Sequence, residues 1–332
     1  MSKQKVLVAG ASGYAGALAA YLVWRHPQLE LVAATARSDV GERLDRLYPR
    51  YRVPIELTEL DLEASDSVDA ALVAYPHAAA TPVVAGLRGL GVQVVDLSAD
   101  FRLVDTATYE LWYGPHGDPD LLENAVYGLT ELARERVAEA ELVANPGCYP
   151  TAALLALAPL AERGLIAAAT IDAKSGISGA GRGGGDGTSF VNVTENVSAY
   201  GVDGHRHLPE IEQELKRLGA EAPVTFVPHL VPLDQGLLAS CYVDLAEDLS
   251  EDALRSLFAD RYRDDPFVEV VDSPPGVRAV RDTNLCLLHA ALVGERRAAV
   301  FAAIDNLWKG ASGQAIQNLN LMLGFDETEG LS

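Results

Sequence analysis

Short apolar runs alternate with more mixed stretches over the first half of the chain. The runs predict strands at residues 5–9, 29–35, 70–74 and 92–96. Alanine-rich helices are predicted after the first strand, ending near His26, and between the third and fourth strands. Each strand is apolar almost throughout, which is typical of a parallel sheet covered by helices on both faces. This half is therefore predicted to be an α/β domain.

The pattern changes after residue 148. Longer apolar runs predict strands at residues 171–174, 225–228, 237–244 and 285–293. A polar-faced helix is predicted at residues 250–262, another helix at 312–323 and a frayed end at 326–332. Long strands with few helices between them indicate a mostly antiparallel α+β domain. Two domains are also expected because 332 residues exceed one ordinary hydrophobic core.

A lone cysteine stands where a predicted strand passes into a predicted helix. Residues 142–144 end the strand, Asn-Pro-Gly at 145–147 forms a turn, and Pro150 falls in the first turn of an Ala- and Leu-rich helix. Cys148 thus lies against a helix N-terminus, whose N–H groups and dipole favour a thiolate, the nucleophilic form of cysteine. Packing as a small apolar side chain is the commoner case, and this motif alone does not separate the two.

A glycine-rich turn follows the first predicted strand and opens the first predicted helix. Such a turn lets the backbone approach a pyrophosphate, whose charge then meets the helix N-terminus. Its position directly after the strand favours dinucleotide binding over a purely structural turn. The residues of this turn assigned to the cofactor are Gly10, Ser12, Gly13, Tyr14, Ala15 and Gly16.

The end of the second predicted strand favours NADP. An NAD site usually places an acidic residue there to accept hydrogen bonds from the ribose hydroxyls, whereas this chain has Thr35, Arg37 and Ser38. A guanidinium and hydroxyl groups suit a 2′-phosphate, so Arg37 and Ser38 are assigned to NADP. Asp39 is the nearest acid and keeps NAD as the alternative.

Two polar clusters follow in the second half. Residues 175–182 interleave serines with glycines and end at Arg182, which is typical of a loop that contacts a bound group; a flexible surface loop is the alternative. His205, Arg206 and His207 precede a predicted helix. An acid/base histidine beside an anion-binding arginine is favoured there over a structural pair. No companion Cys/His cluster supports a zinc site, and no metal is expected.

The net charge and the cysteine content limit the kinds of partner and the cell compartment that we expect. The chain has 47 acidic and 26 basic residues, a net charge of −21, which argues against nucleic acid or an anionic membrane as a partner. An anionic substrate would need local cations, since the overall field repels it. The sequence has no apolar run long enough to cross a bilayer, no export leader and three scattered cysteines, so we expect a cytoplasmic protein.

Taken together, the motifs resemble those of the N-acetyl-γ-glutamyl-phosphate reductases, a family of the semialdehyde dehydrogenase superfamily. The matching segments lie at residues 10–16, 96–102, 126–131, 145–151, 178–182, 205–211 and 305–311. The cysteine motif and the His-Arg-His motif are specific in combination. The resemblance implies a Rossmann-type NADP-binding domain at residues 1–147, completed by a C-terminal helix within 312–332. It implies a catalytic and oligomerisation domain at residues 148–311.

The resemblance also implies a reaction: NADPH-dependent reduction of a small-molecule acyl phosphate. Cys148 would attack the acyl phosphate to give a thioester, hydride transfer would reduce it, and His207, or else His205, would protonate the oxyanion. The family suggests a homo-oligomer, a dimer or a tetramer. Further cofactor contacts are assigned to Ser178, Gly179 and Asn306, and substrate contacts to Ser98, Arg102, Asn145, Ser175, Arg182, Arg206 and Glu210.

One departure from the family pattern leaves the substrate open. Relatives typically carry an Arg-Gly pair after a Pro-His-Leu-x-Pro segment, whereas this chain has Gln235 before Gly236. If the missing guanidinium binds the substrate carboxylate in relatives, another group must replace it, and Arg206 is the candidate. Aspartate-semialdehyde dehydrogenase, the lysine-pathway aminoadipyl-phosphate reductase and a non-catalytic NADP-sensing protein stand as alternatives.

Overall fold

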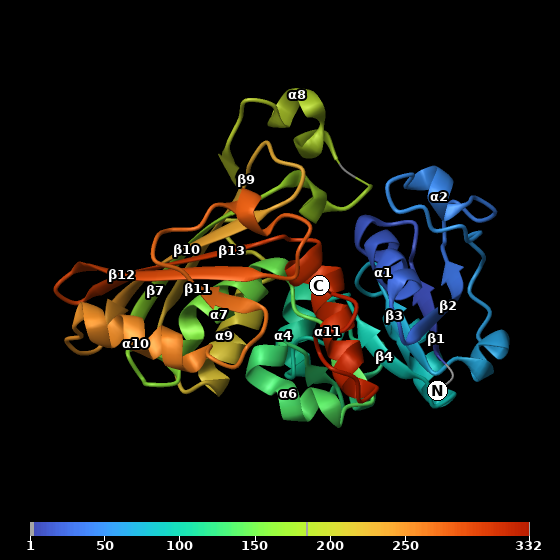
Figure 1. Ribbon diagram of the computed structural model, residues 1–332, viewed down its shortest axis with the longest axis horizontal. Coiled ribbons are helices and arrows are strands. Elements are labelled where there is room, and N and C mark those ends of the chain that lie inside the picture. Colours follow the sequence, from blue (N-terminus) through green and yellow to red (C-terminus); the bar gives the residue numbers. More distant parts are fainter. Residues whose placement is uncertain (1–2, 184, 332) are drawn as a thin grey trace. The chain divides into compact units, whose positions relative to one another are not determined.

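The computed structural model describes residues 3–183 and 185–331. The chain divides into two compact units, Met1–Gly147 with Ala311–Ser332 and Cys148–Gly310 (Figure 1). Each unit has its own sheet. Among the described residues, no helix has both the length and the apolar character needed to cross a membrane.

The first unit is built on a six-stranded sheet in the order β2-β1-β3-β4-β6-β5. Its strands are β1 (Gln4–Ala9), β2 (Leu29–Thr35), β3 (Ala70–Val73), β4 (Gln93–Asp96), β5 (Val126–Tyr127) and β6 (Leu142–Ala144). All neighbouring pairs are parallel, which confirms the α/β prediction. The chain passes from β1 to β2 on one side and returns to β3 on the other. The C-terminal ends of β1 and β3 therefore flank the point where the strand order reverses, which is where ligands bind in such sheets.

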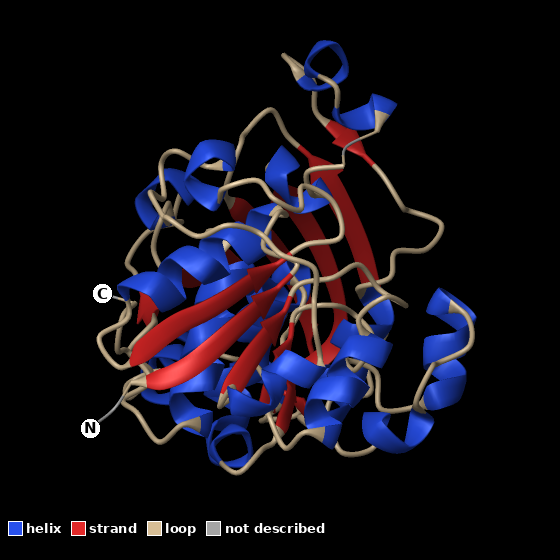
Figure 2. Ribbon diagram, turned by 90° about the vertical axis from the view of Figure 1, so that its right-hand side faces the viewer, coloured by secondary structure: helices blue, strands red, loops and turns tan. Residues whose placement is uncertain are grey.

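Helices lie on both faces of this sheet (Figure 2). They are α1 (Tyr14–Arg25), α2 (Leu44–Leu47), α3 (Thr81–Gly89), α4 (Thr106–Tyr113), α5 (Pro119–Leu122), α6 (Thr130–Ala138) and α11 (Gly313–Met322), with a 3₁₀ turn at Glu63–Ser67. α1 packs against α11, whereas α3 contributes to a separate core with Leu7, Ala9 and Val73. Because successive strand residues point to opposite faces and both faces are covered, the strands are largely apolar, although Glu30 of the edge strand β2 is exposed.

The last helix, α11, is buried together with its amide side chains. Asn318 is fully buried, and its Nδ2 donates to the carbonyl of Gly128 at 2.7 Å. Thr130 Oγ1 donates to Asn318 Oδ1 at 2.7 Å, and Gln314 Nε2 donates to Thr130 Oγ1 at 2.7 Å. Buried polar groups need such partners. This helix, which is last in the sequence, is therefore an internal part of the first unit.

The residues after α11 do not fray. His26 Nε2 and Asn320 Nδ2 both donate to the carbonyl of Glu329, at 3.0 and 2.9 Å, and Leu331 is buried. The prediction of a frayed end is therefore wrong for residues 326–331. The ends of a chain are often poorly ordered, but here backbone carbonyl groups accept hydrogen bonds from buried donors of the first unit.

The second unit contains a seven-stranded mixed sheet. Its strands, in spatial order, are β11 (Val268–Val270), β12 (Cys286–Gly294), β13 (Arg297–Ile304), β10 (Leu237–Leu245), β7 (Ile166–Ser175), β9 (Val224–Leu230) and β8 (Ser198–Ala199). In the described residues the neighbouring pairs are antiparallel except β11–β12 and β7–β9, which are parallel. The prediction of a mostly antiparallel α+β domain is thus confirmed, with two parallel pairs added.

Helices of the second unit gather on one face of its sheet. They are α7 (Cys148–Ala161), α9 (Leu208–Arg217) and α10 (Glu251–Arg261), while the four-residue α8 (Phe190–Val193) lies away from that face (Figure 1). Along β10, Cys241 and Val243 are fully buried, whereas the intervening Tyr242 is half-buried and Asp244 is exposed. This alternation marks one face packed against helices and one face of mixed character.

Candidate active site

The glycine-rich turn after β1 has no room for side chains at two of its three glycines. Gly10 has φ +89°, and a Cβ there would lie 2.6 Å from the carbonyl oxygen of Ala74, just after β3. A Cβ on Gly16 would lie 2.1 Å from the carbonyl oxygen of Gly10. Gly13 is the N-cap of α1 and offers no side-chain acceptor to the first N–H groups of the helix. The turn therefore presents backbone N–H groups at a helix N-terminus, the arrangement that binds phosphate.

Other residues hold this turn in place. Gly10 and Ala11 both donate their N–H groups to the carbonyl of Thr35, at 2.9 Å each. The hydroxyl of Tyr48 donates to the carbonyl of Ser12 at 2.7 Å, and the ring of Tyr14 packs edge-on against that of Tyr48. The carbonyl of Ala15 accepts from Ser312 Oγ at 2.7 Å.

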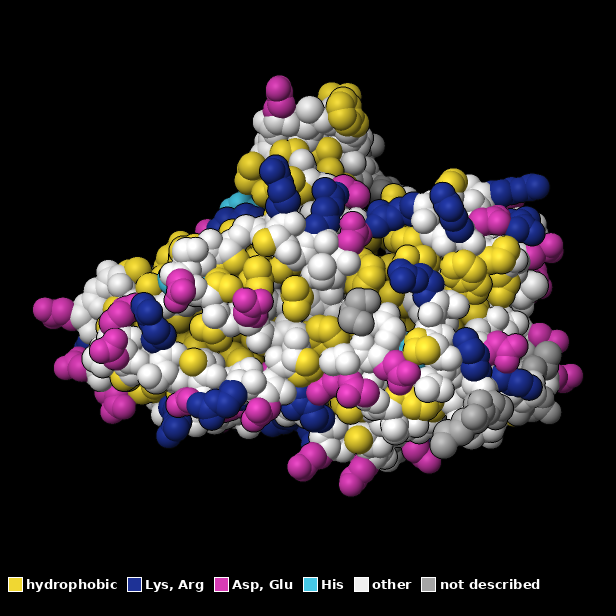
Figure 3. Space-filling view, in the orientation of Figure 1, with side chains coloured by type: hydrophobic (Ala, Val, Ile, Leu, Met, Phe, Trp, Pro, Cys, Tyr) yellow, Lys and Arg dark blue, Asp and Glu magenta, His cyan; other side chains and the backbone are white. Residues whose placement is uncertain are grey.

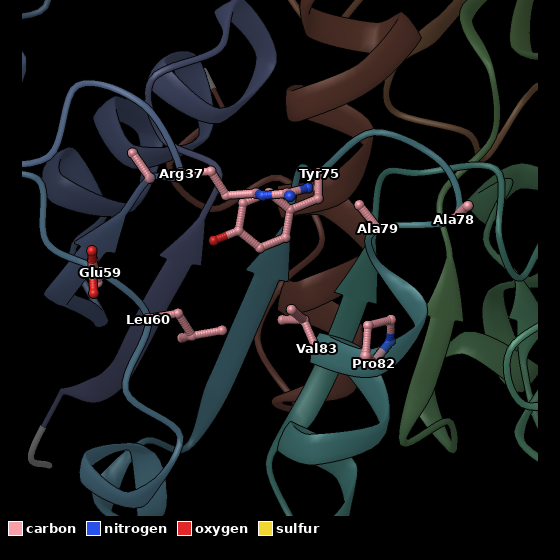
Figure 4. Close-up of a pocket in the computed structure, with 9 residues that line it drawn as sticks. Arg37, Glu59, Leu60, Tyr75, Ala78, Ala79, Pro82 and Val83 are labelled. Atoms are coloured by element: carbon pink, nitrogen blue, oxygen red, sulfur yellow. The ribbon is translucent and has the colours of Figure 1, made fainter.

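A cleft of about 590 Å³ opens beyond the C-terminal ends of β2 and β3. Its walls are Ala36, Arg37, Glu59, Leu60, Tyr75, Ala78, Ala79, Pro82 and Val83. In Figure 4 the side chain of Arg37 lies alongside the ring of Tyr75. The cleft lies where the strand order reverses, which is the place expected for a dinucleotide in this type of sheet.

The side chains around Arg37 set the local charge of this region. Ser38 Oγ donates to Asp39 Oδ2 at 3.1 Å, and both Arg37 and Ser38 are exposed. Basic side chains gather around α2 on the face seen in Figure 3, although acidic residues outnumber basic ones in the chain as a whole. The first unit therefore offers local cations beside the cleft, which an anionic ligand needs in a chain of net charge −21.

Ser98, Arg102 and Asn145, all predicted to contact substrate, lie close together in the first unit. Arg102 is buried; its Nε donates to the carbonyl of Asn145 and its Nη2 to that of Leu97, at 2.8 Å each. Asn145 Nδ2 donates to the carbonyl of Ala311 at 3.1 Å, and Ser98 Oγ donates to Asp96 Oδ2 at 2.6 Å. These side chains thus hold the backbone after β4 and β6.

Cys148 is the first residue of α7, a helix of 14 residues. Its side chain is half-buried, whereas Cys241 and Cys286 are fully buried. Burial raises the pKa of the Cys241 thiol to about 12, so that group stays protonated. A Cβ added to Gly310 would lie 2.7 Å from the Cβ of Cys148, so this glycine lets the backbone approach the cysteine closely. Among the three thiols, Cys148 has both exposure and a helix N-terminus to stabilise its thiolate.

Aromatic and imidazole rings cluster next to Cys148. The ring of Tyr149 lies 5.8 Å from each of the His205 and His207 rings, whose centroids are 4.9 Å apart. The hydroxyl of Tyr149 lies 3.1 Å from that of Tyr200 and donates to the carbonyl of His229 at 3.2 Å. The structure therefore brings both predicted histidines to the residue that follows the cysteine.

The surroundings of His205 determine its tautomer and its ionisation. His205 Nδ1 accepts the backbone N–H of His207 at 3.1 Å, which places the proton of the neutral ring on Nε2. Burial, and to a lesser degree the charge of Arg206, lowers the pKa of His205 to about 4. His205 is thus a neutral hydrogen-bond donor at pH 7.

The loop of residues 175–182 is held by internal hydrogen bonds. Ser178 Oγ donates to the carbonyl of Asp234 at 2.6 Å and accepts from Asn306 Nδ2 at 2.9 Å. Asn306 Oδ1 in turn accepts the N–H of Gly236 at 2.7 Å. Ser175 Oγ donates to the carbonyl of Gly176 at 3.2 Å. A Cβ on Gly179 would lie 3.4 Å from Ser175 Oγ.

The remaining predicted substrate residues differ in exposure. Arg182 and Arg206 are exposed, whereas Glu210 is buried in the first turn of α9. Among the described residues, no group of three or more His, Cys, Asp or Glu side chains could hold a metal ion.

Known proteins match the chain along its whole length. The family model described as "Semialdehyde dehydrogenase, NAD binding domain" matches residues 5–140, and "Semialdehyde dehydrogenase, dimerisation domain" matches residues 148–306. The N-acetyl-gamma-glutamyl-phosphate reductase of Desulforudis audaxviator is 49% identical over 98% of this chain and 97% of its own. The enzyme of that name from Dehalococcoides mccartyi is 45% identical over 100% and 98%. The chain belongs to the N-acetyl-gamma-glutamyl-phosphate reductase family.

Solved structures of a related enzyme class share the fold of this reductase family member. Aspartate semialdehyde dehydrogenase II from Vibrio cholerae superposes with a TM-score of 0.75 at 17% identity, over 98% of this chain and 99% of its own. The Candida albicans enzyme, solved with NADP, gives a TM-score of 0.74 at 16% identity, over 97% and 99%. At such low identity these structures establish the fold alone.

The residue that departs from the reductase pattern lies in the interior. Gln235 is 3% exposed, and the adjacent Gly236 has φ +121° with room for no Cβ, which would lie 2.7 Å from Val277. An uncharged amide is less costly to bury at such a position than a guanidinium.

The residues of the cleft wall other than Arg37 were not predicted from the sequence. Only the position of residues 75–83 after a strand beside β1 could have indicated them.

Proposed function

We propose that this chain catalyses the NADPH-dependent reduction of N-acetyl-γ-glutamyl phosphate to N-acetylglutamate semialdehyde and phosphate, in arginine biosynthesis. The observation that carries the proposal is the position of Cys148 at the first residue of α7, with the histidine pair packed around Tyr149. A nucleophile at a helix N-terminus beside an acid/base group suits acyl transfer from an acyl phosphate.

In the first half-reaction, His207 takes the proton of the Cys148 thiol and the thiolate attacks the γ-acyl carbon. The bond between that carbon and the phosphate oxygen then breaks, and phosphate leaves with its electron pair. A thioester remains on Cys148. The N-terminal N–H groups and dipole of α7 stabilise the thiolate before attack.

In the second half-reaction the thioester is reduced by two electrons. Bound NADPH would supply the hydride. His207 then stabilises the oxyanion on the former carbonyl oxygen, and the carbon–sulfur bond breaks to release the aldehyde and regenerate the thiolate. His205, whose pKa is lowered to about 4, is neutral at pH 7, so we assign the acid/base role to His207 and give His205 a hydrogen-bonding role.

The first unit supplies the dinucleotide site in this proposal. The turn at Gly10, Ser12, Gly13, Tyr14, Ala15 and Gly16 would hold the pyrophosphate, because only glycine fits where the backbones of Gly10 and Ala74 approach. Arg37 and Ser38, exposed at the end of β2, would hold the 2′-phosphate. Ser178, Gly179 and Asn306 of the second unit would bind the cofactor mainly through backbone groups, since the side chains of Ser178 and Asn306 form hydrogen bonds within that unit.

Substrate anions would be held by local cations. Arg206 and Arg182 are exposed and are the proposed partners of the substrate carboxylate and phosphate, with Ser175 in the same loop as Arg182. Arg206 also remains our replacement for the family arginine absent at Gln235. Ser98, Arg102, Asn145 and Glu210 would act by holding the backbone around the site, since the first three bond to backbone or to Asp96 and Glu210 is buried.

The two units divide the work in the proposed enzyme. Met1–Gly147 with the C-terminal helix would bind NADP, and Cys148–Gly310 would carry catalysis and oligomerisation. A homo-oligomer, dimer or tetramer, would use the face of the seven-stranded sheet opposite α7, where Tyr242 and Phe301 are half-buried. That face joins apolar and charged side chains, as subunit interfaces do.

The test is phosphate-dependent reduction of NADP by the purified protein, with N-acetylglutamate semialdehyde and aspartate semialdehyde in parallel. We expect turnover with the acetylated substrate alone. Cys148→Ser should abolish turnover and still bind NADPH, whereas Cys241→Ala, a buried thiol far along the sequence, should keep it. Turnover by Cys148→Ser near the wild-type rate would refute the mechanism. Turnover with aspartate semialdehyde alone would refute the substrate.

A further inference from the structure

A buried carboxylate stands behind one wall of the cleft in the first unit. Asp100 is fully buried and does not line the cleft. In the part of the chain that the structure describes, no lysine or arginine forms an ion pair with it. Its carboxylate is satisfied instead by four hydrogen bonds from neutral donors. A buried charge held only by such bonds depends on each of them.

Two of the four donors are backbone N–H groups, one in the cleft wall and one at the start of α3. Ala78 N–H donates to Asp100 Oδ1 at 2.7 Å, and Thr81 N–H donates to Oδ2 at 3.0 Å. Thr81 Oγ1 also donates to Oδ2, at 2.8 Å, and the hydroxyl of Tyr109 donates to Oδ1 at 3.0 Å. Ala78 and Ala79 line the cleft, and Thr81 begins α3. The carboxylate thus ties the segment 78–81 to α4, which carries Tyr109.

This segment needs an external restraint. Ala78 has φ +63°, a left-handed conformation that an alanine adopts at a cost. α3 has Ala80 as its N-cap and no side-chain acceptor of its own there. Asp100 provides both a restraint on Ala78 and a cap for α3. It accepts the N–H of the strained Ala78, and it accepts the N–H of Thr81 at the start of the helix. Strained backbone persists where surrounding contacts hold it.

The backbone of Asp100 is itself held in place by hydrogen bonds to Ser98 and His116. Its N–H donates to Ser98 Oγ at 3.0 Å, and its carbonyl accepts from His116 Nε2 at 2.8 Å. The His116 ring packs edge-on against Tyr109 and Phe101. The carboxylate therefore occupies a fixed position, set by residues that lie away from the cleft.

We infer that Asp100 is a positioning residue for the dinucleotide: it holds Ala78 and the start of α3 in the conformation that shapes the cleft. The inference rests on the proposed function, in which this cleft takes part in NADPH binding. It predicts that Asp100 acts on cofactor affinity and leaves the chemical step at Cys148 unchanged.

The test measures NADPH affinity and kcat separately. In Asp100→Asn one carboxylate oxygen becomes an NH₂ group, which faces donors and cannot accept their bonds, so we expect the Kd for NADPH to rise about tenfold or more. We expect kcat at saturating NADPH to stay within about twofold, since the Asp100 carboxylate accepts its hydrogen bonds from Ala78, Thr81 and Tyr109 and from none of the proposed catalytic groups. Asp105→Asn is the matched control. Asp105 also caps a helix, accepting from Thr108 N–H at 2.8 Å at the start of α4, but unlike Asp100 it holds no residue of the cleft wall.

A second substitution separates positioning from general stability. Glycine adopts φ +63° without strain, so Ala78→Gly added to Asp100→Asn should restore part of the lost affinity, about threefold. If Asp100→Asn does not fold, Tyr109→Phe removes a single donor to the same carboxylate and should raise the Kd for NADPH about two- to threefold.

Three outcomes would overturn the role of Asp100 in cofactor binding. A folded Asp100→Asn protein with the wild-type Kd, or Tyr109→Phe with the wild-type Kd where Asp100→Asn fails to fold, overturns the role of Asp100. An equal loss of affinity in Asp105→Asn also overturns it, since any weakened cap would then suffice. A wild-type protein that does not bind NADPH refutes the proposed cofactor and, with it, this role.

Discussion

The sharpest perturbation of the proposed nucleophile is a single methyl group at Gly310. Alanine there would place a Cβ 2.7 Å from the Cβ of Cys148 and 3.3 Å from its Cα. Ordinary contact begins near 3.4 Å, so the two Cβ atoms must separate by about 0.7 Å. The backbone of Gly310 is not in the left-handed region, so alanine adds the contact without adding backbone strain.

The cost follows from that displacement. A misplacement of about 1 Å at a reacting group can lower a rate on the order of 10²-fold, so we expect kcat of Gly310→Ala to fall about ten- to hundredfold. Overpacking should lower the free energy of unfolding by about 1–3 kcal/mol. The Kd for NADPH should stay unchanged, since neither Gly310 nor Cys148 is among the proposed cofactor contacts.

The assay combines steady-state kinetics with the rate of Cys148 alkylation by iodoacetamide, located by mass spectrometry. Gly276→Ala is the control: its added Cβ would meet nothing within 4 Å, and its φ of −108° suits any residue. Wild-type kcat and alkylation rate in Gly310→Ala would show that the cysteine does not depend on this close approach, and the reasoning would fail.

Four further predictions concern the two histidines, a buried carboxyl group and a buried amide. His207→Asn should lower kcat about 10²- to 10⁴-fold, whereas His205→Asn should lower it less than about tenfold, and equal losses would contradict the assignment. Because the folded-state pKa of His205, about 4, lies below its ordinary 6.5, stability is lost as pH falls between these values; His205→Asn should flatten the acid side of a plot of Tm against pH. Burial raises the pKa of Asp96 to about 7, so stability falls as pH rises from 3.8 to about 7, and the gain in Tm of Asp96→Asn over wild type should be larger at pH 8 than at pH 5. Asn318→Ala should lower the free energy of unfolding in urea by about 2–4 kcal/mol, because it leaves the carbonyl of Gly128 and the hydroxyl of Thr130 without their partner.

The strands that could be predicted are those with a clear local pattern. The apolar run at 285–293 indicated β12, but its hairpin partner β13 (Arg297–Ile304) was missed, because an alanine-rich segment fits a buried helix as well as a strand. Only pairing with β10 and β12 on its two sides fixes it as a strand. The frayed end was predicted from its position at the end of the chain, which carries no information on the buried donors that Glu329 meets.

The candidate site likewise contains some residues that the local sequence could predict and others that it could not. Cys148 and the turn at Gly10 could be found because each depends on a strand-to-helix junction that is local in sequence. The cleft wall at Tyr75 and Ala78 could not, since it is defined by the neighbour that β3 finds in the sheet. The low pKa of His205 also escaped prediction, because burial, which the local sequence does not show, lowers it.

The placement of α11 has a consequence for how the chain folds during synthesis. The first unit is complete only when residues 311–332 have been made, although its other residues end at Gly147. At about 5–20 residues per second, the ribosome needs on the order of ten seconds or more to make the intervening stretch. During that time Thr130 and Asn145 lack the amide of Asn318. Cys148–Gly310 leaves the ribosome as one uninterrupted segment, so the usual order is inverted: the later-starting unit can finish first, and release of the C-terminus completes the earlier one.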